Sequence, residues 1–293
     1  MTDNPLFALA TSGKRRTHPI LALVVAVAAI LLGGIIGAII LAFTGLPADP
    51  ALRTLVNLVT GFAPVALLIW LWIGLFEQRG FRTLGFTREH AARRSALGLL
   101  TGVVSFGLVT AILVVPGFTL TENVPQGLAA IGPAILVFAG WVVQGSTEEI
   151  VTRGFLLPVV GARYGAVVGV GLSSMLFAAL HLLNPGINAL SLVNLVLVGV
   201  LLGLYALWEG ALWGVCLWHA AWNWAQGNVF GFEVSGTDTG MMAIVDLKEN
   251  GPDVVTGGVF GPEGGVATTL VLALGIAVLS LGLRRASRQA RPA

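Results

Sequence analysis

Charged side chains are scarce in this chain. Only 10% of its 293 residues are Asp, Glu, Lys or Arg, whereas 56% are hydrophobic and the mean hydropathy is +0.90. This composition excludes an ordinary water-soluble domain, because such a domain needs more polar surface than these residues supply. The sequence therefore predicts a polytopic membrane protein, and the expected fold class is an all-α helix bundle.

Cysteine is nearly absent as well. Cys216 is the single cysteine and lies inside an apolar run, so an intrachain disulfide and a cysteine metal cluster are excluded and a packed thiol is expected. Positive charge is in small excess, with a formal net charge of +2. Because the arginines gather near the expected helix ends, they indicate membrane orientation, and no nucleic-acid partner is expected.

Eight apolar segments approach the ~20 residues that a helix needs to cross the hydrocarbon layer. They cover residues 20–43, 54–76, 95–115, 131–158, 166–182, 189–207, 210–226 and 266–283. The resulting organisation is a cytoplasmic tail at 1–19, N-terminal transmembrane helices at 20–123, a core at 124–228, an acidic extramembrane loop at 229–265, and the last transmembrane helix with a basic tail at 266–293.

Two further features refine this organisation. Pairs of small residues spaced four apart predict a tightly packed bundle. They are Gly33/Gly37, Gly98/Gly102, Gly165/Gly169, Gly199/Gly203 and Gly210/Gly214. The stretch 227–265 is rich in Gly, Pro and acidic residues, which predicts an exposed loop with little regular structure.

Basic residues are distributed unequally among the connections. If the N-terminus is cytoplasmic, the inner segments hold Lys14, Arg15, Arg16, the five arginines of 77–94, Arg163 and the four arginines of the tail. The outer segments then hold only Arg53 and Lys248. By the positive-inside rule, the sequence predicts a multi-pass protein of a bacterial-type plasma membrane, with both termini cytoplasmic and the acidic loop outside.

Three charges stand in the middle of the fourth apolar segment: Glu148, Glu149 and Arg153. An ionisable side chain at the bilayer centre costs at least ~2.5 kcal/mol, so such a group is by default a functional-site hypothesis. On a helix, Glu149 and Arg153 stand in the favourable order for an ion pair, while Glu148 points ~100° away. We expect the pair to be structural and Glu148 to be free for chemistry.

Two more polar motifs lie in apolar helices: Phe177-x-x-x-His181 and His219-x-x-x-Asn223. The spacing of the second motif puts an imidazole and an amide on one helical face. Either histidine alone would more often be a satisfied core residue, and Asn223 alone is open to a role in helix–helix hydrogen bonding. Taken together with Glu148, they favour a site within the membrane.

The three motifs together resemble those of the CAAX-protease and bacteriocin-processing (CPBP) family of intramembrane endopeptidases, which includes the type II CAAX prenyl endopeptidase. The matching residues are Glu-Glu-x-x-x-Arg at 148–153, Phe-x-x-x-His at 177–181 and His-x-x-x-Asn at 219–223. The resemblance implies a multi-helix bundle of about eight transmembrane helices around an intramembrane site, which cleaves peptide or protein substrates near the bilayer.

The resemblance also implies a role for each matching residue. Glu148 corresponds to the catalytic glutamate that activates water, and His181 to the histidine that helps to hold that water. His219 and Asn223 correspond to the pair proposed to stabilise the oxyanion. The supporting residues are Glu149, Arg153 and Phe177, the last as part of the pocket wall.

Several alternatives stay open. Glu148, His181 and His219 could form a zinc site, although no His-Glu-x-x-His helix is present, and we expect no cofactor. The chain could also be a non-catalytic immunity, scaffold or transporter protein that keeps the fold. The expected partners are a peptide or protein substrate and the lipid bilayer. The tryptophans of the seventh segment are expected to be lipid or interface anchors: Trp218, Trp222 and Trp224.

Overall fold

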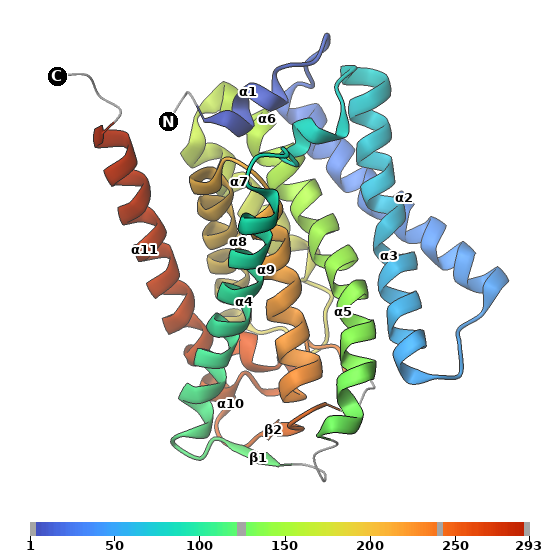
Figure 1. Cartoon of the computed structure of the whole chain (residues 1–293), viewed down its shortest axis with the longest axis vertical. Coiled ribbons are helices and arrows are strands. Elements are labelled where there is room, and N and C mark those ends of the chain that lie inside the picture. Colours follow the sequence, from blue (N-terminus) through green and yellow to red (C-terminus); the bar gives the residue numbers. More distant parts are fainter. Residues whose placement is uncertain (1–3, 122–126, 239–242, 290–293) are drawn as a thin grey trace.

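The structure, a computed structural model, describes residues 4–121, 127–238 and 243–289. The expected boundary at residues 123 and 124 and residues 290–293 of the basic tail lie outside these ranges. Within them the chain forms a bundle of helices with a single two-stranded sheet (Figure 1). The predicted fold class is confirmed, since the protein is a helical membrane bundle.

The helices follow the apolar segments closely. The α-helices are α1 (Pro5–Ala10), α2 (Pro19–Thr44), α3 (Pro50–Trp72), α4 (Ala91–Val114), α5 (Leu128–Glu149), α6 (Leu157–Tyr164), α7 (Ala166–Leu180), α8 (Ala189–Glu209), α9 (Trp213–Trp224), α10 (Asp253–Thr256) and α11 (Val266–Gln289). Three π-helical stretches extend them: η1 (Ile73–Glu77), η3 (Ile150–Leu156) and η4 (Ala225–Phe230). Short 3-10 turns are η2 (Phe81–Leu84), η5 (Gly258–Phe260) and η6 (Pro262–Gly264).

Each of the eight predicted spans is helical, but the count of eight membrane-crossing helices is not confirmed. In the described residues, six helices are long and apolar enough to cross a membrane. They are Pro19–Thr44, Pro50–Glu77, Ala91–Val114, Leu128–Tyr164, Ala189–Glu209 and Val266–Ala286. The other two predicted spans correspond to α7, with 15 residues, and α9, with 12.

The fourth span runs unbroken through the charged motif, as predicted, but its middle is π-helical. Pro158 has no N–H to donate, and its ring crowds the carbonyl four residues earlier. The helix widens just before Pro158, and the N–H of Leu157 bonds to the carbonyl of Thr152, five residues back. A π turn inserts an extra residue into the helix and changes which side later residues face. The side chains of the residues after Glu149 therefore point in other directions than they would in a uniform α-helix.

The predicted close packing of helices is confirmed most clearly between α4 and α9. A Cβ atom added at Gly98 would lie 2.1 Å from the carbonyl oxygen of Gly214, and one at Gly102 would lie 2.4 Å from that of Trp218. Neither distance is tolerable, so only glycine lets the two backbones approach this closely. α9, which carries His219 and Asn223, is thereby held firmly against α4.

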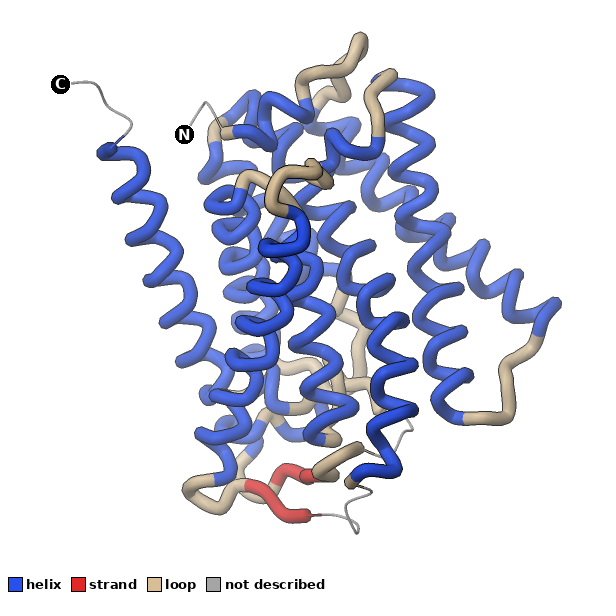
Figure 2. Tube along the Cα trace, viewed as in Figure 1, coloured by secondary structure: helices blue, strands red, loops and turns tan. Residues whose placement is uncertain are grey.

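The segment between α9 and α11 departs from the prediction of an exposed loop with little structure. Residues 247–249 form β2 (Leu247–Glu249), which pairs antiparallel with β1 (Thr119–Thr121). Phe232 is 2% exposed and Phe260 is fully buried. The composition of the stretch is dominated by Gly, Pro and acids, and it gives no sign that these aromatic side chains are buried. Their burial anchors the segment against the helices. The backbone trace shows that β2 lies beside β1 at one end of the bundle (Figure 2).

The two ends of the bundle differ in charge. α1, α6 and the C-terminal part of α11 lie at one end in Figure 1, whereas β1, β2 and α10 lie at the other. We call the first the basic end, because it holds Arg163 and the arginine-rich connection between η1 and α4. We call the second the loop end, because it holds residues 231–238 and 243–265, which we call the loop segment.

Candidate active site

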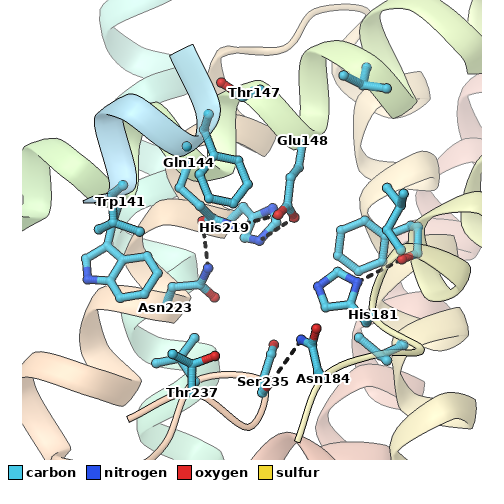
Figure 3. A pocket seen from close by; sticks show the side chains of 18 of the residues that line it. Trp141, Gln144, Thr147, Glu148, His181, Asn184, His219, Asn223, Ser235 and Thr237 are labelled. Atoms are coloured by element: carbon cyan, nitrogen blue, oxygen red, sulfur yellow. Dashed lines mark hydrogen bonds and ion pairs between the residues drawn. The ribbon is translucent and has the colours of Figure 1, made fainter. Parts of the chain in front are cut away.

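A cavity of about 460 Å³ lies among the helices and collects the predicted site residues (Figure 3). Its wall comes from α2, α3, α5, α7, α8, α9 and the loop segment. The α7 and α8 residues that line it, among them Phe177 and Leu195, lie near the connection between these helices. That connection contacts the loop segment, since Asn184 Nδ2 donates to the carbonyl of Ser235 at 2.9 Å. The cavity therefore lies in the half of the bundle nearest the loop end.

Glu148 lines this cavity from the last turn of α5. Its Oε1 accepts a hydrogen bond of 2.7 Å from Nε2 of Gln144. Its Oε2 is buried without a hydrogen-bond partner and lies 3.7 Å from Nε2 of His219. A buried oxygen without a partner costs free energy, so this one is a candidate position for a water or substrate group. The prediction that Glu148 faces away from the ion pair agrees with this placement.

Glu149 and Arg153 form the predicted ion pair, with 2.9 Å between Arg153 Nη1 and Glu149 Oε1. Both side chains are fully buried. Nη2 of Arg153 also donates to the carbonyl of Gly199 on α8 at 3.0 Å. The guanidinium lies 4.8 Å from the ring centre of Phe177, within the range of a cation–π contact. The pair thus ties the fourth span to α7 and α8.

The carboxylate of Glu149 also orients His219, and the sequence did not indicate this contact. Nδ1 of His219 donates to Oε1 of Glu149 at 2.9 Å. A histidine held this way presents its Nε2 to the opposite side, here toward Glu148. Glu149 is therefore a positioning group for the imidazole as well as the partner of Arg153. Nothing in the sequence links residues 149 and 219, because their contact depends on the packing of α5 against α9.

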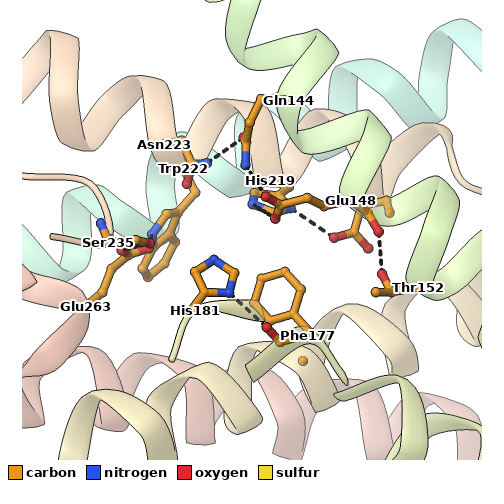
Figure 4. Close-up of polar contacts among 12 residues, drawn as sticks. Gln144, Glu148, Thr152, Phe177, His181, His219, Trp222, Asn223, Ser235 and Glu263 are labelled. Atoms are coloured by element: carbon orange, nitrogen blue, oxygen red, sulfur yellow. Dashed lines mark hydrogen bonds and ion pairs between the residues drawn. The ribbon is translucent and has the colours of Figure 1, made fainter. Parts of the chain in front are cut away.

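His181 enters the cavity from the C-terminal end of α7. Its Nδ1 donates to the carbonyl of Phe177 at 2.8 Å, and this bond leaves Nε2 free to face the cavity (Figure 4). The ring of Phe177 packs against both imidazoles, with centroid distances of 4.8 Å to His181 and 5.9 Å to His219. Phe177 is therefore part of the pocket wall, as predicted, and it keeps the two histidines apart.

Asn223 lines the cavity and is connected to Glu148 by way of Gln144, a residue for which the sequence predicts no role. Its Nδ2 donates to Oε1 of Gln144 at 2.9 Å, and Gln144 in turn donates to Glu148. Gln144 stands four residues before Glu148, so helical spacing alone could have placed it on the same face. One proton of the Asn223 amide group is used by Gln144, and an amide nitrogen has a second to offer.

The tryptophan prediction was wrong for two of its three residues. Trp218 and Trp222 are 4% and 2% exposed, line the cavity and stack on each other at 4.9 Å. Trp224 donates to the carbonyl of Ala134 at 2.8 Å and so joins α9 to α5. Interfacial anchoring is a tendency of tryptophans at helix ends, and here the seventh segment is covered by α4 and α5 instead.

Three polar residues at the loop end of the cavity, Ser235, Thr237 and Glu263, were not identified from the sequence. Figure 3 shows Asn184, Ser235 and Thr237 across the cavity from Glu148. Glu263, from the turn before α11, also lines it. The composition of residues 227–265 predicts an external loop and gives no reason to place these residues in the site.

The zinc alternative requires Glu148, His181 and His219 to bind one ion together. Among the described residues, no group of three or more His, Cys, Asp or Glu side chains is arranged to hold a metal ion. Glu148, His181 and His219 all line the cavity, but they do not converge on one point as a ligand set. Cys216 is buried in the core and does not line the cavity.

Comparisons with known proteins bear on the same segment. Residues 130–225 match the family model described as "Type II CAAX prenyl endopeptidase Rce1-like". All three polar motifs lie within the match, and the resemblance inferred from them is confirmed. No curated protein and no solved structure matches the chain.

Proposed function

We propose, from the Rce1-like segment at residues 130–225, that this protein is an intramembrane endopeptidase in which Glu148 activates water. CAAX-protease-type activity follows from the family. The finer proposal rests on one observation: a Glu148 oxygen that has no hydrogen bond lies 3.7 Å from Nε2 of His219, in a cavity that His181 also lines. The proposed substrates are peptide bonds of proteins at the bilayer.

The chemistry can be written with residues already in place. A water held between Glu148 and Nε2 of His181 attacks the carbonyl carbon of the peptide bond, and its proton passes to Glu148. General-base assistance of this kind contributes typically about 10²–10⁴-fold. When the tetrahedral intermediate collapses, Glu148 returns the proton to the leaving nitrogen, which departs as an amine.

The negative oxygen of the intermediate needs hydrogen-bond donors. The second N–H of the Asn223 amide and Nε2 of His219 are the proposed donors. Because Nδ1 of His219 already donates to Glu149, Nε2 donates only when the ring carries both protons. Each such donor is worth about 3–4 kcal/mol of barrier lowering in other hydrolases. No metal is required in this scheme.

A cleavage assay on purified protein in proteoliposomes tests the proposal. We expect the wild type to hydrolyse membrane-anchored peptides at the same rate with and without a chelator, and His181→Ala to lower kcat/KM by roughly 10²-fold. His90→Ala is the matched control, because that side chain is 59% exposed and outside the cavity.

Two outcomes would contradict the proposal in different ways. Loss of cleavage on chelation, restored by added zinc, would make Glu148, His181 and His219 metal ligands. Absence of any cleavage by the wild type would favour a non-catalytic immunity, scaffold or transporter protein.

We also propose that the cavity is reached from the extracytoplasmic side. It lies toward the loop end, whereas the arginines gather at the basic end, which the positive-inside rule assigns to the cytoplasm. This orientation puts both termini in the cytoplasm of a plasma membrane.

Cysteine labelling in intact cells checks this orientation. In a Cys216→Ala background, a membrane-impermeant maleimide is expected to label Thr237→Cys, and to label Ala286→Cys only after permeabilisation. Both positions are exposed in the structure, so a lack of labelling would not reflect burial. Labelling of both from one side, or the reverse pattern, would contradict the proposed orientation.

A further inference from the structure

Glu263 is an acidic side chain of the cavity for which the proposed mechanism has no use. It belongs to η6, the turn that precedes α11, and lines the cavity together with Ser235 and Trp222. Figure 4 places it on the opposite side of His181 from Glu148. It therefore stands where a bound peptide would extend away from the reacting bond, toward the loop end.

The carboxylate of Glu263 is held rigidly by neutral donors. Its Oε1 accepts from Nε1 of Trp222 at 3.1 Å. Its Oε2 accepts from the backbone N–H of Ser235 at 2.8 Å and from Oγ of Ser235 at 2.7 Å. Its own backbone carbonyl accepts from Asn194 at 2.8 Å. The two carboxylate oxygens are thus surrounded by three hydrogen-bond donors and no acceptor. This environment suits an ionised carboxylate, because such a group can accept hydrogen bonds but cannot donate them.

No lysine or arginine in the described part of the chain pairs with this carboxylate. None of the ion pairs in the described part of the chain includes Glu263. By contrast, the buried acids Glu77 and Glu149 each pair with an arginine. Among the described residues that line the cavity there is no lysine or arginine. Partly buried charges are normally paired, so a fixed, unpaired carboxylate facing a cavity indicates a ligand of opposite charge.

We infer that Glu263 forms a subsite for a positively charged group of the substrate. That group is either a Lys or Arg side chain or the free amino terminus of the peptide. The inference rests on the proposed peptidase function and extends it to substrate class.

Paired peptides test the charge preference in the full-length protein. Each pair differs by Lys or Gln at one scanned position, and every peptide is made with a free and with an acetylated amino terminus. We expect the wild type to cleave the better cationic member with a kcat/KM about tenfold above its neutral counterpart, as for a charge pair at a partly desolvated site. Acetylation identifies whether the amino terminus or the side chain is the recognised group.

Four variants separate recognition of the substrate's positive charge from the structural role of the hydrogen bonds that Glu263 makes. Glu263→Gln should bring the cationic-to-neutral ratio to about one. Thr237→Lys should also reduce the ratio, because it adds a cation to the cavity lining and leaves the bonds of Glu263 intact. Ser235→Ala should keep the ratio even where it slows cleavage, because the carboxylate remains. Asp253→Asn, which removes an exposed acid of the same segment, is the matched control and should change nothing.

Two results would overturn the inference while leaving the peptidase proposal intact. One is a wild type that cleaves both members of every pair equally. The other is an unchanged preference in both Glu263→Gln and Thr237→Lys. If no peptide is cleaved at all, the proposed function itself fails, and the subsite inference fails with it.

Discussion

Replacing Glu148 with glutamine is expected to abolish peptide cleavage while leaving the protein folded. Glutamine keeps the size of the side chain and can still bond to Gln144, but it cannot take a proton from water. The expected loss in kcat is about 10²–10⁴-fold, the usual contribution of a general base. Glu148→Asp should retain a small fraction of the activity, because the carboxylate is kept and withdrawn by about one bond length from its position.

The measurement is an initial-rate assay in proteoliposomes, with thermal unfolding in detergent to show that the fold is intact. Glu89→Gln is the matched control, because that side chain is 79% exposed and outside the cavity. We expect the control to keep the wild-type rate. A Glu148→Gln variant that cleaves as fast as the control would refute the role of Glu148 as the base.

Replacing Arg153 with methionine is expected to produce the largest loss of stability. Methionine fills much of the same volume but leaves the carboxylate of Glu149 buried without a cation. Removing one partner of a buried ion pair costs about 3–5 kcal/mol, and here the bond to the carbonyl of Gly199 is lost as well. The same change frees Glu149, which also holds His219, so cleavage should fall together with stability.

Equilibrium unfolding in mixed micelles measures this effect. Arg163→Met is the matched control, since Arg163 is an exposed arginine in α6, the continuation of the same span. The double variant Glu149→Gln/Arg153→Met should recover part of the lost free energy of unfolding, because no unpaired charge stays buried. Equal stability of Arg153→Met and Arg163→Met would show that the buried pair is not structurally important.

The sequence by itself determined the features that depend on composition and local spacing. A hydrophobic fraction of 56% requires helices that satisfy their own backbone in lipid, and the apolar runs placed those helices within a few residues. The Glu149–Arg153 pair followed from helical spacing, because residues four apart on one helix meet whatever surrounds them. The separate direction of Glu148 followed for the same reason.

Only the tertiary structure decided which distant residues meet. The contact of His219 with Glu149 joins residues 70 positions apart, and it depends on how α9 packs against α5. The burial of Trp218 and Trp222, and the entry of Ser235 and Glu263 into the cavity, likewise depend on neighbours that are remote in the chain. Periodicity reports which side of a helix is apolar, but it does not report what covers that side. For that physical reason the candidate catalytic residues were found from their motifs, and the loop end of the cavity was not.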